Sequence, residues 1–171
     1  SDSVSWIDSS GNLWLFGGNG YDWSGTVADY LNDLWRFDGT NWTWVSGSNV
    51  RMQNGEYGIK GTADPANKPG ARQRSVSWID SSGDLWLFGG SGYDSIGSVG
   101  GLNDLWRFDG TNWTWVSGSD VINQNGVYGT KGTAHSANVP GCRSDSVSWI
   151  DSSGNLWLFG GLGRDSAGEA G

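Results

Sequence analysis

The string SVSWIDSSG occurs at residues 3–11, 75–83 and 146–154, and each copy leads into the string LWLFGG, at residues 13–18, 85–90 and 156–161. The first string returns at offsets of 72 and 71 residues. A third string, LNDLWRFDGTNWTWVSGS, is present without a single difference at residues 31–48 and 102–119. Self-similarity at a fixed period is the signature of a repeat architecture. We therefore divide the chain into a first repeat (1–72), a second repeat (73–143) and a partial third repeat (144–171).

Each full repeat contains four short segments of β-favouring residues. In the first repeat we expect strands at residues 3–7, 12–16, 33–37 and 42–46. Clusters of Asp, Ser, Asn and Gly separate these segments, which is the pattern of β-hairpins. No stretch has an extended apolar period of 3.6 residues, so we expect little helix. The sequence therefore predicts an all-β chain of four-stranded antiparallel sheets.

The expected strands are apolar on both faces. Leu13 and Leu15 point to one side of the second strand, while Trp14 and Phe16 point to the other. A sheet that is covered on both faces has this pattern, whereas a sheet with one wet face alternates apolar and polar residues. Four-stranded sheets stacked about an axis cover one another in this way, and this architecture is the β-propeller. We expect about two and a half blades, either as an open segment or as part of a larger ring or assembly.

The repeat unit resembles that of the kelch family of β-propellers, which includes galactose-oxidase-like and bacterial repeat proteins. The family has an apolar run into a double glycine, then an aromatic residue on the third strand and a tryptophan on the fourth. The matching residues are Gly17, Gly18, Phe37 and Trp42, then Gly89, Gly90, Phe108 and Trp113, then Gly160 and Gly161. Arg72 and Arg143, which precede the first strands of the second and third repeats, also fit.

This chain departs from the kelch pattern in its period, which is longer than the roughly 50 residues of that family. The additional length lies at about residues 47–70, between a fourth strand and the next first strand. An alternative motif is the Asp-box of sialidase-like propellers, which Asp8, Gly11 and Trp14 resemble with one residue too many between Asp and Gly. Either resemblance implies a propeller.

The long connections of each repeat lie at one edge of a sheet whose strands alternate in direction. In the first repeat these are residues 19–31 and 47–70. Because binding residues concentrate in long loops on a rigid scaffold, we expect ligand contacts there. The candidate ligand contacts are Tyr21, Asp22, Trp23, Tyr93, Asp94 and Arg164. The remaining tryptophans occupy repeated strand positions, where we expect them to pack between sheets.

The composition disfavours several classes of partner and site. The formal net charge of −8 disfavours nucleic acid and anionic membranes. His135 is the single histidine and Cys142 the single cysteine, so we expect no metal, no cofactor and no disulfide within the chain. The kelch resemblance also covers copper radical oxidases, whose ligand set these two residues do not supply. A calcium site at Asp22, Asp29 and Asp33 is an alternative to a role in turns, although no EF-hand spacing occurs.

These features predict a non-catalytic extracellular binding or scaffold module that contacts protein or glycan through its long loops. One alternative is a structural unit of an extracellular assembly or filament that associates with itself. Another is a piece of a larger kelch enzyme with catalytic residues elsewhere. A fractional repeat exposes an apolar sheet face and unpaired strand edges. We therefore expect other copies of the chain, or further repeats of a parent chain, as partners. The acidic, nearly cysteine-free composition favours a secreted or cell-surface location.

Overall fold

The computed structural model describes residues 1–169 and 171, and every regular element in them is a β-strand. The first sheet has the order β1-β2-β3-β4 with antiparallel pairing throughout. Its strands are β1 (Val4–Ile7), β2 (Leu13–Tyr21), β3 (Ala28–Phe37) and β4 (Trp42–Ser46). The prediction of an all-β chain of antiparallel sheets is therefore confirmed, and the first sheet has the four strands expected.

The second sheet repeats this arrangement and adds two short strands. Its main strands are β7 (Val76–Ile79), β8 (Leu85–Tyr93), β9 (Val99–Phe108) and β10 (Trp113–Ser117). The short strand β5 (Ala63–Asp64) pairs with the outer edge of β10, and β6 (Arg72–Gln73) pairs with the end of β8. The sequence did not predict either short strand.

The third sheet is partial. The strands β12 (Val147–Ile150) and β13 (Leu156–Phe159) pair with each other, and β11 (Arg143–Ser144) pairs with β14 (Leu162–Gly163). Within the described residues, β13 has no strand on the side where β8 has β9. The outer edge of β13 is therefore open.

We expected the second strand of a repeat to end at its double glycine. The structure shows instead that the strand continues past these two residues. Gly17 and Gly18 have positive φ angles of 58° and 96°, and the register of β2 against β3 shifts between Phe16 and Gly18. Glycine adopts such angles at little cost, so the backbone forms a bulge and the strand continues to Tyr21. The same irregularity recurs in β8.

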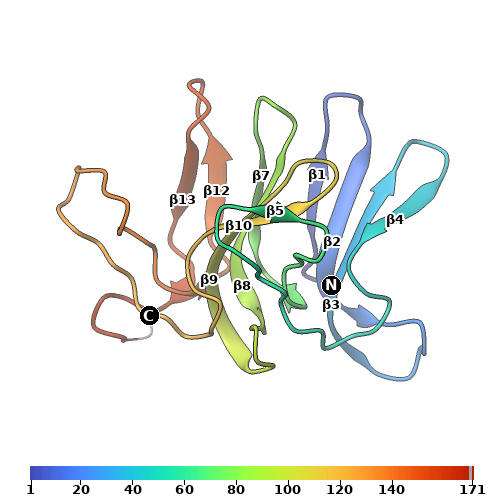
Figure 1. The fold of residues 1–171 in the computed structure, drawn as a ribbon, viewed down its shortest axis with the longest axis horizontal. Coiled ribbons are helices and arrows are strands. Elements are labelled where there is room, and N and C mark those ends of the chain that lie inside the picture. Colours follow the sequence, from blue (N-terminus) through green and yellow to red (C-terminus); the bar gives the residue numbers. More distant parts are fainter. Residues whose placement is uncertain (170) are drawn as a thin grey trace.

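The three sheets stand side by side in chain order (Figure 1). Aromatic side chains fill the first interface, where Trp14 contacts Phe108 at 5.9 Å between ring centroids and Phe16 contacts Trp113 at 5.6 Å. At the second interface, Trp78 and its neighbours pack against Leu156 and Leu158 of β13. The second sheet is therefore covered on both faces, as predicted, whereas the first and third are covered on one.

The tight hairpin turns lie at one edge of the sheets and the β2–β3 and β8–β9 loops at the opposite edge (Figure 1). The long segment at residues 47–70 does not stay at that second edge, which corrects the expectation for this segment. It crosses to the second sheet, because β5 pairs with β10 and Asn67 donates to the Trp113 carbonyl oxygen at 3.0 Å. This segment thus belongs structurally to the sheet that follows it.

The conformation of Gly89 generates the first testable prediction. A Cβ atom on Gly89 would lie 2.7 Å from the Arg143 carbonyl oxygen, whereas one on Gly160, at the same place in the third repeat, would meet nothing within 4 Å. Both residues have positive φ. We expect Gly89→Ala to lower the free energy of unfolding by about 3 kcal/mol and Gly160→Ala by about 1 kcal/mol. Urea unfolding of both variants measures this, and equal losses would contradict the assigned packing.

Candidate binding site

The candidate contacts of the first repeat lie at the end of β2. Tyr21 and Trp23 are 66% and 74% exposed. The Asp22 carboxylate is mostly covered, because it accepts from the Arg51 guanidinium at 3.1 Å and from the Ser24 amide and hydroxyl. The hydrogen bond from Ser24 and the Arg51 charge hold the pKa of Asp22 below its usual value. Asp22 thus organises the loop, while Tyr21 and Trp23 remain free to contact a ligand.

The equivalent residues of the second repeat are buried, which corrects the exposed placement expected from the sequence. Tyr93 packs edge-on against Tyr30 of the first sheet at 6.1 Å between ring centroids. The Asp94 carboxylate accepts from the backbone amides of Ile96 and Ser98 at 3.0 and 2.8 Å. Neither side chain is accessible to a ligand in this structure.

Arg164 is the candidate residue of the third repeat and does not join the others. It lines a groove of about 340 Å³ together with Tyr128 and Arg143 at the far end of the molecule. Tyr21, Asp22 and Trp23 line a separate cleft of about 420 Å³ with Asp33, Trp35 and Trp44. The six candidate residues therefore fall into two end surfaces and one buried pair.

A buried polar cluster, which sequence reasoning missed, joins the first two repeats. The Asp104 carboxylate on β9 accepts two hydrogen bonds from the Arg72 guanidinium, both at 2.7 Å. It also accepts from the Tyr57 hydroxyl and from the Trp106 indole N–H, each at 2.7 Å. We call these four residues the Asp104 cluster. Arg72 and Asp104 have side chains 1% and 0% exposed, so the pair is fully desolvated.

The charges of the Asp104 cluster depend on one another. Burial alone would lower the pKa of Arg72, but the adjacent Asp104 carboxylate raises it above its usual value. Burial and the Asp104 charge both raise the pKa of Tyr57, so its hydroxyl stays protonated and donates. A buried charge is tolerated only when it is paired and hydrogen-bonded, and here each partner satisfies the other.

The segment at residues 47–70 carries Tyr57 into this cluster and adds further contacts to the second sheet. The Tyr57 ring lies between Trp106 and Trp115, at 4.9 and 5.0 Å between centroids. The Lys60 ammonium sits 4.1 Å from the Trp115 ring centroid and donates to the Gly118 carbonyl oxygen at 2.7 Å. The first repeat therefore uses its long connection to fasten the second sheet.

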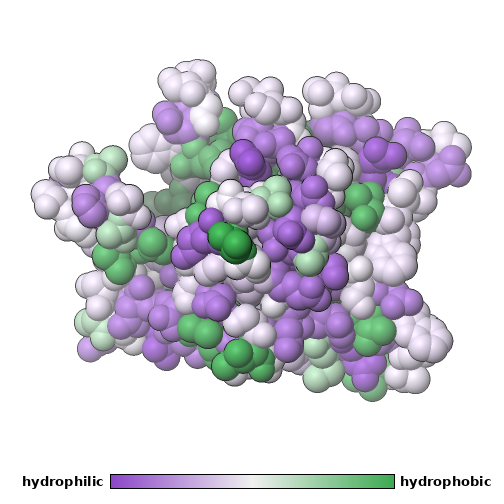
Figure 2. Space-filling model, viewed as in Figure 1, coloured by the Kyte–Doolittle hydropathy of each residue, from purple (hydrophilic) through white to green (hydrophobic). Residues whose placement is uncertain are grey.

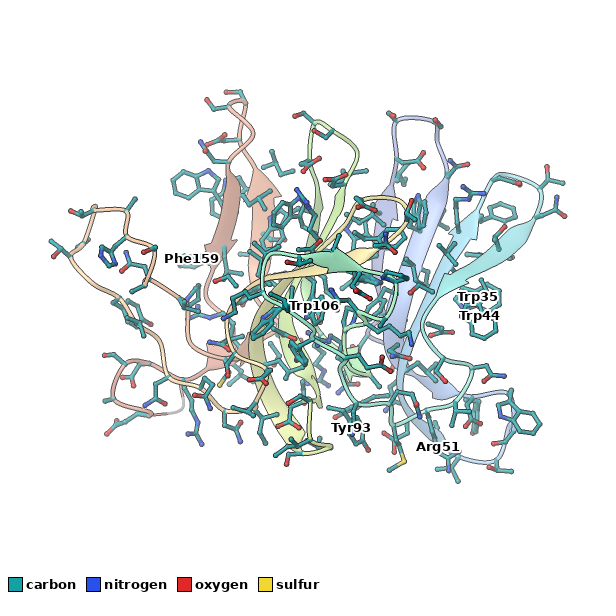
Figure 3. The ribbon with its side chains drawn as sticks, in the orientation of Figure 1. Trp35, Trp44, Arg51, Tyr93, Trp106 and Phe159 are labelled. Atoms are coloured by element: carbon teal, nitrogen blue, oxygen red, sulfur yellow. The ribbon has the colours of Figure 1, made fainter. Side chains whose placement is uncertain are left out.

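The first sheet presents the same surface without these contacts. Its outer face carries Asp33, Trp35, Trp42 and Trp44, which are the repeat equivalents of Asp104, Trp106, Trp113 and Trp115. Asp33 accepts from the Trp35 indole N–H at 2.6 Å, as Asp104 does from Trp106. Burial without a cationic partner raises the pKa of Asp33. In Figure 3, Trp35 and Trp44 lie on the outside at one end, whereas Trp106 lies in the middle of the molecule.

Beside the third sheet lie Arg143 and Tyr128, the repeat equivalents of Arg72 and Tyr57 of the Asp104 cluster. Arg143 donates to the carbonyl oxygens of Gly141 and Gly160 at 3.0 and 3.1 Å, which reproduces the bonds from Arg72 to Gly70 and Gly89. Tyr128, the equivalent of Tyr57, is 56% exposed instead of 6%. Phe159 on β13 stands at the end opposite to Trp35 and Trp44 (Figure 3).

The broad side of the molecule between these ends is of a different character. Figure 2 shows hydrophobic residues there in separate small patches among hydrophilic ones. The described part of the chain contains no helix with the length and hydrophobicity of a membrane span. The residues described also hold no group of three His, Cys, Asp or Glu that could bind a metal, so Asp22, Asp29 and Asp33 do not come together as a calcium site. Only the outer faces of the first and third sheets, at the two ends, carry the repeat equivalents of residues that are buried between sheets elsewhere in the described residues.

No protein-family model matches the sequence, and no curated protein matches it. The chain is similar in structure to a solved protein titled "Structure of YjhT", with a TM-score of 0.49 and 16% sequence identity. The match covers 95% of this chain and 54% of that one, so the chain spans about half the length of that protein.

The carboxylate that recurs at Asp33 and Asp104 allows a matched test of the Asp104 cluster. Asp104→Asn leaves the Arg72 charge buried without a counter-charge, so we expect the free energy of unfolding to fall by about 3 kcal/mol or more. Asp33→Asn removes the same charge in the same sequence context but breaks no ion pair. We expect it to change stability by less than about 1 kcal/mol. Chemical denaturation of the two variants measures the difference, and similar losses would show that the ion pair does not hold the sheets together.

Proposed function

We propose that this chain is a non-catalytic scaffold module of kelch-like repeats that binds protein through the sheet surfaces at its two ends. The observation that carries the proposal is the contrast between Trp42 and Trp113. These residues occupy identical sequence contexts, yet Trp42 is 49% exposed and Trp113 is 1% exposed. The sequence of the first sheet therefore builds a surface that is complementary to another protein sheet.

The exposed residues of the third sheet support the same proposal. Phe159 is 69% exposed, whereas its equivalent Phe16 is 1% exposed. Trp149 and Trp157 stack at 5.8 Å beside it and are also half exposed. Large contiguous apolar surfaces on soluble proteins mark binding sites. The composition, with a single cysteine and a net charge of −8, agrees with the further proposal that the module acts outside the cell or at its surface.

The test is the concentration dependence of the particle mass. We expect light scattering to show a mass that rises above 18.3 kDa as the protein is concentrated. Phe159→Lys and Trp42→Lys should each suppress this rise, because a charge is placed in an apolar contact. Ile96→Lys is the matched control, since Ile96 is 74% exposed on a loop away from both end surfaces. A constant mass of 18.3 kDa, or equal effects of all three substitutions, would refute the proposal.

A second candidate function, glycan binding, rests on the 420 Å³ cleft beside Trp23. Tyr21, Trp23 and Trp44 give this cleft exposed aromatic surface, and Asp22 lies beside them. Aromatic rings with an apolar face and a polar edge suit sugar rings. A concave site with aromatic walls and a few polar groups is a general feature of small-ligand sites.

A glycan array with matched variants tests this second candidate. We expect Trp23→Ala to weaken any bound glycan by roughly tenfold or more, which corresponds to about 1.4 kcal/mol. Ile96→Ala removes an equally exposed apolar side chain from the corresponding loop of the second repeat and should have no effect. The absence of glycan binding by the wild-type chain would exclude this function.

A further inference from the structure

The Asp104 cluster joins the connection of one repeat to the sheet of the next. We call Asp104 with Trp106, on the sheet, the Asp half, and Arg72 with Tyr57, from the connection, the Arg half. The chain contains the equivalents of each half a second time. The Asp half recurs at the outer face of the first sheet, as Asp33 with Trp35 and Trp44. The Arg half recurs beside the third sheet, as Arg143 with Tyr128. In the described residues neither Asp33 nor Arg143 forms a salt bridge. The two unpaired halves have opposite charge.

Both halves are already in the conformation that the complete cluster uses. Asp33 accepts a hydrogen bond from the Trp35 indole N–H at 2.6 Å, and Asp104 accepts the equivalent bond from Trp106 at 2.7 Å. Arg143 is fixed by two backbone carbonyl groups in the same way as Arg72. A groove of about 310 Å³ opens beside Tyr128, Arg143 and Leu158. Association would therefore require little rearrangement of the charged side chains, which lowers its cost.

The sequence identifies what fits this groove. In the second sheet, β8 pairs with β9, and β9 and β10 belong to the string at residues 102–119. The chain contains that string once more, at residues 31–48, which form most of β3 and all of β4. In addition, residues 144–161 are identical to residues 1–18, so β13 has the sequence of the first four residues of β2, the strand with which β3 pairs.

We propose that the partner of the end surfaces is a second copy of this chain, whose β3–β4 hairpin takes the position beside the third sheet and brings its Asp33 to Arg143 and Tyr128. This inference rests on the proposed function and names the partner. Asp33 of the second copy accepts from the Arg143 guanidinium and the Tyr128 hydroxyl, as Asp104 does within the chain. Because each copy has one Asp half and one Arg half, the association runs head to tail and generates rings or filaments.

Two further contacts between the segment at residues 47–70 and the second sheet have equivalents that could form between two copies of the chain. Lys131 corresponds to Lys60, so its ammonium reaches Trp44 of the second copy, as Lys60 reaches Trp115. Residues 134–135 correspond to β5 and lie unpaired in the free loop at the left of Figure 1. They pair with the outer edge of β4 of the second copy, as β5 pairs with β10.

The arrangement has one steric consequence. Residues 1–18 of the second copy and residues 144–161 of the first copy are identical in sequence, so β1–β2 and β12–β13 would occupy the same position next to β3. One of these two strand pairs must leave that position when the copies associate. Association is therefore an exchange of strands.

The test uses two variants, each of which reverses the charge at only one of the two end surfaces. Asp33→Arg leaves only the Arg half intact, and Arg143→Asp leaves only the Asp half intact. We expect each variant alone to associate about 30-fold more weakly than wild type, because the loss of one member of a buried ion pair costs about 2 kcal/mol or more. An equimolar mixture of the neutral variants Asp33→Asn and Arg143→Gln keeps an Asp33–Arg143 pair at one junction only, so it should form a one-to-one complex of twice the 18.3 kDa monomer mass and nothing larger. Analytical ultracentrifugation measures all three samples.

Matched controls separate the contact from net charge and from folding. Glu56→Lys and Lys68→Glu reverse the charges of an exposed pair on the segment at residues 47–70 and should leave association unchanged. Asp33→Asn and Arg143→Gln repeat the test with smaller changes, and the tryptophan fluorescence of every variant reports its fold. If the wild type associates and the single variants associate equally well, the head-to-tail contact is wrong while the scaffold proposal stands. If the wild type stays at 18.3 kDa at every concentration, both fail.

Discussion

The buried ion pair between Arg72 and Asp104 is the contact on which the arrangement of repeats depends. An isolated pair of charges in a protein interior costs more in desolvation than its attraction returns, unless other hydrogen bonds satisfy the remaining atoms. Here Tyr57, Trp106 and two backbone carbonyl groups provide those bonds. The pair therefore fixes how the connection of one repeat meets the sheet of the next, while the aromatic contacts between Trp14, Phe16, Phe108 and Trp113 supply the apolar burial.

The order of the elements makes this contact directional. Arg72 and Tyr57 come from the end of one repeat, and Asp104 comes from the middle of the next. Within the described residues, the carboxylate of the first sheet therefore lacks its cation, and the cation of the last connection lacks its carboxylate. Asp33, with a pKa raised by burial, and Arg143, fixed by Gly141 and Gly160, are these two groups. The exposed aromatic residues at the ends follow from the same asymmetry.

Sequence reasoning found the strands and the sheets because both depend on local patterns. The alternation of Leu13, Trp14, Leu15 and Phe16 predicted a sheet with two apolar faces, which the second sheet confirms. The sequence could not predict that β2 continues beyond Gly18 to Tyr21, because this depends on a bulge that forms only when β2 pairs with β3. The Asp104 cluster was also missed, since Tyr57 and Asp104 are 47 residues apart. The recurrence of Tyr57 as Tyr128 and of Arg72 as Arg143 was the available signal.

The most direct measurement is an experimental structure of the protein at a concentration where it associates. The account predicts Asp33 of one copy within hydrogen-bond distance of Arg143 and Tyr128 of its neighbour, with two short contacts to the guanidinium like the 2.7 Å bonds of Arg72 to Asp104. Trp42 should then be as deeply buried as Trp113. A structure in which copies meet through other surfaces, with Asp33 and Arg143 both in solvent, would contradict it.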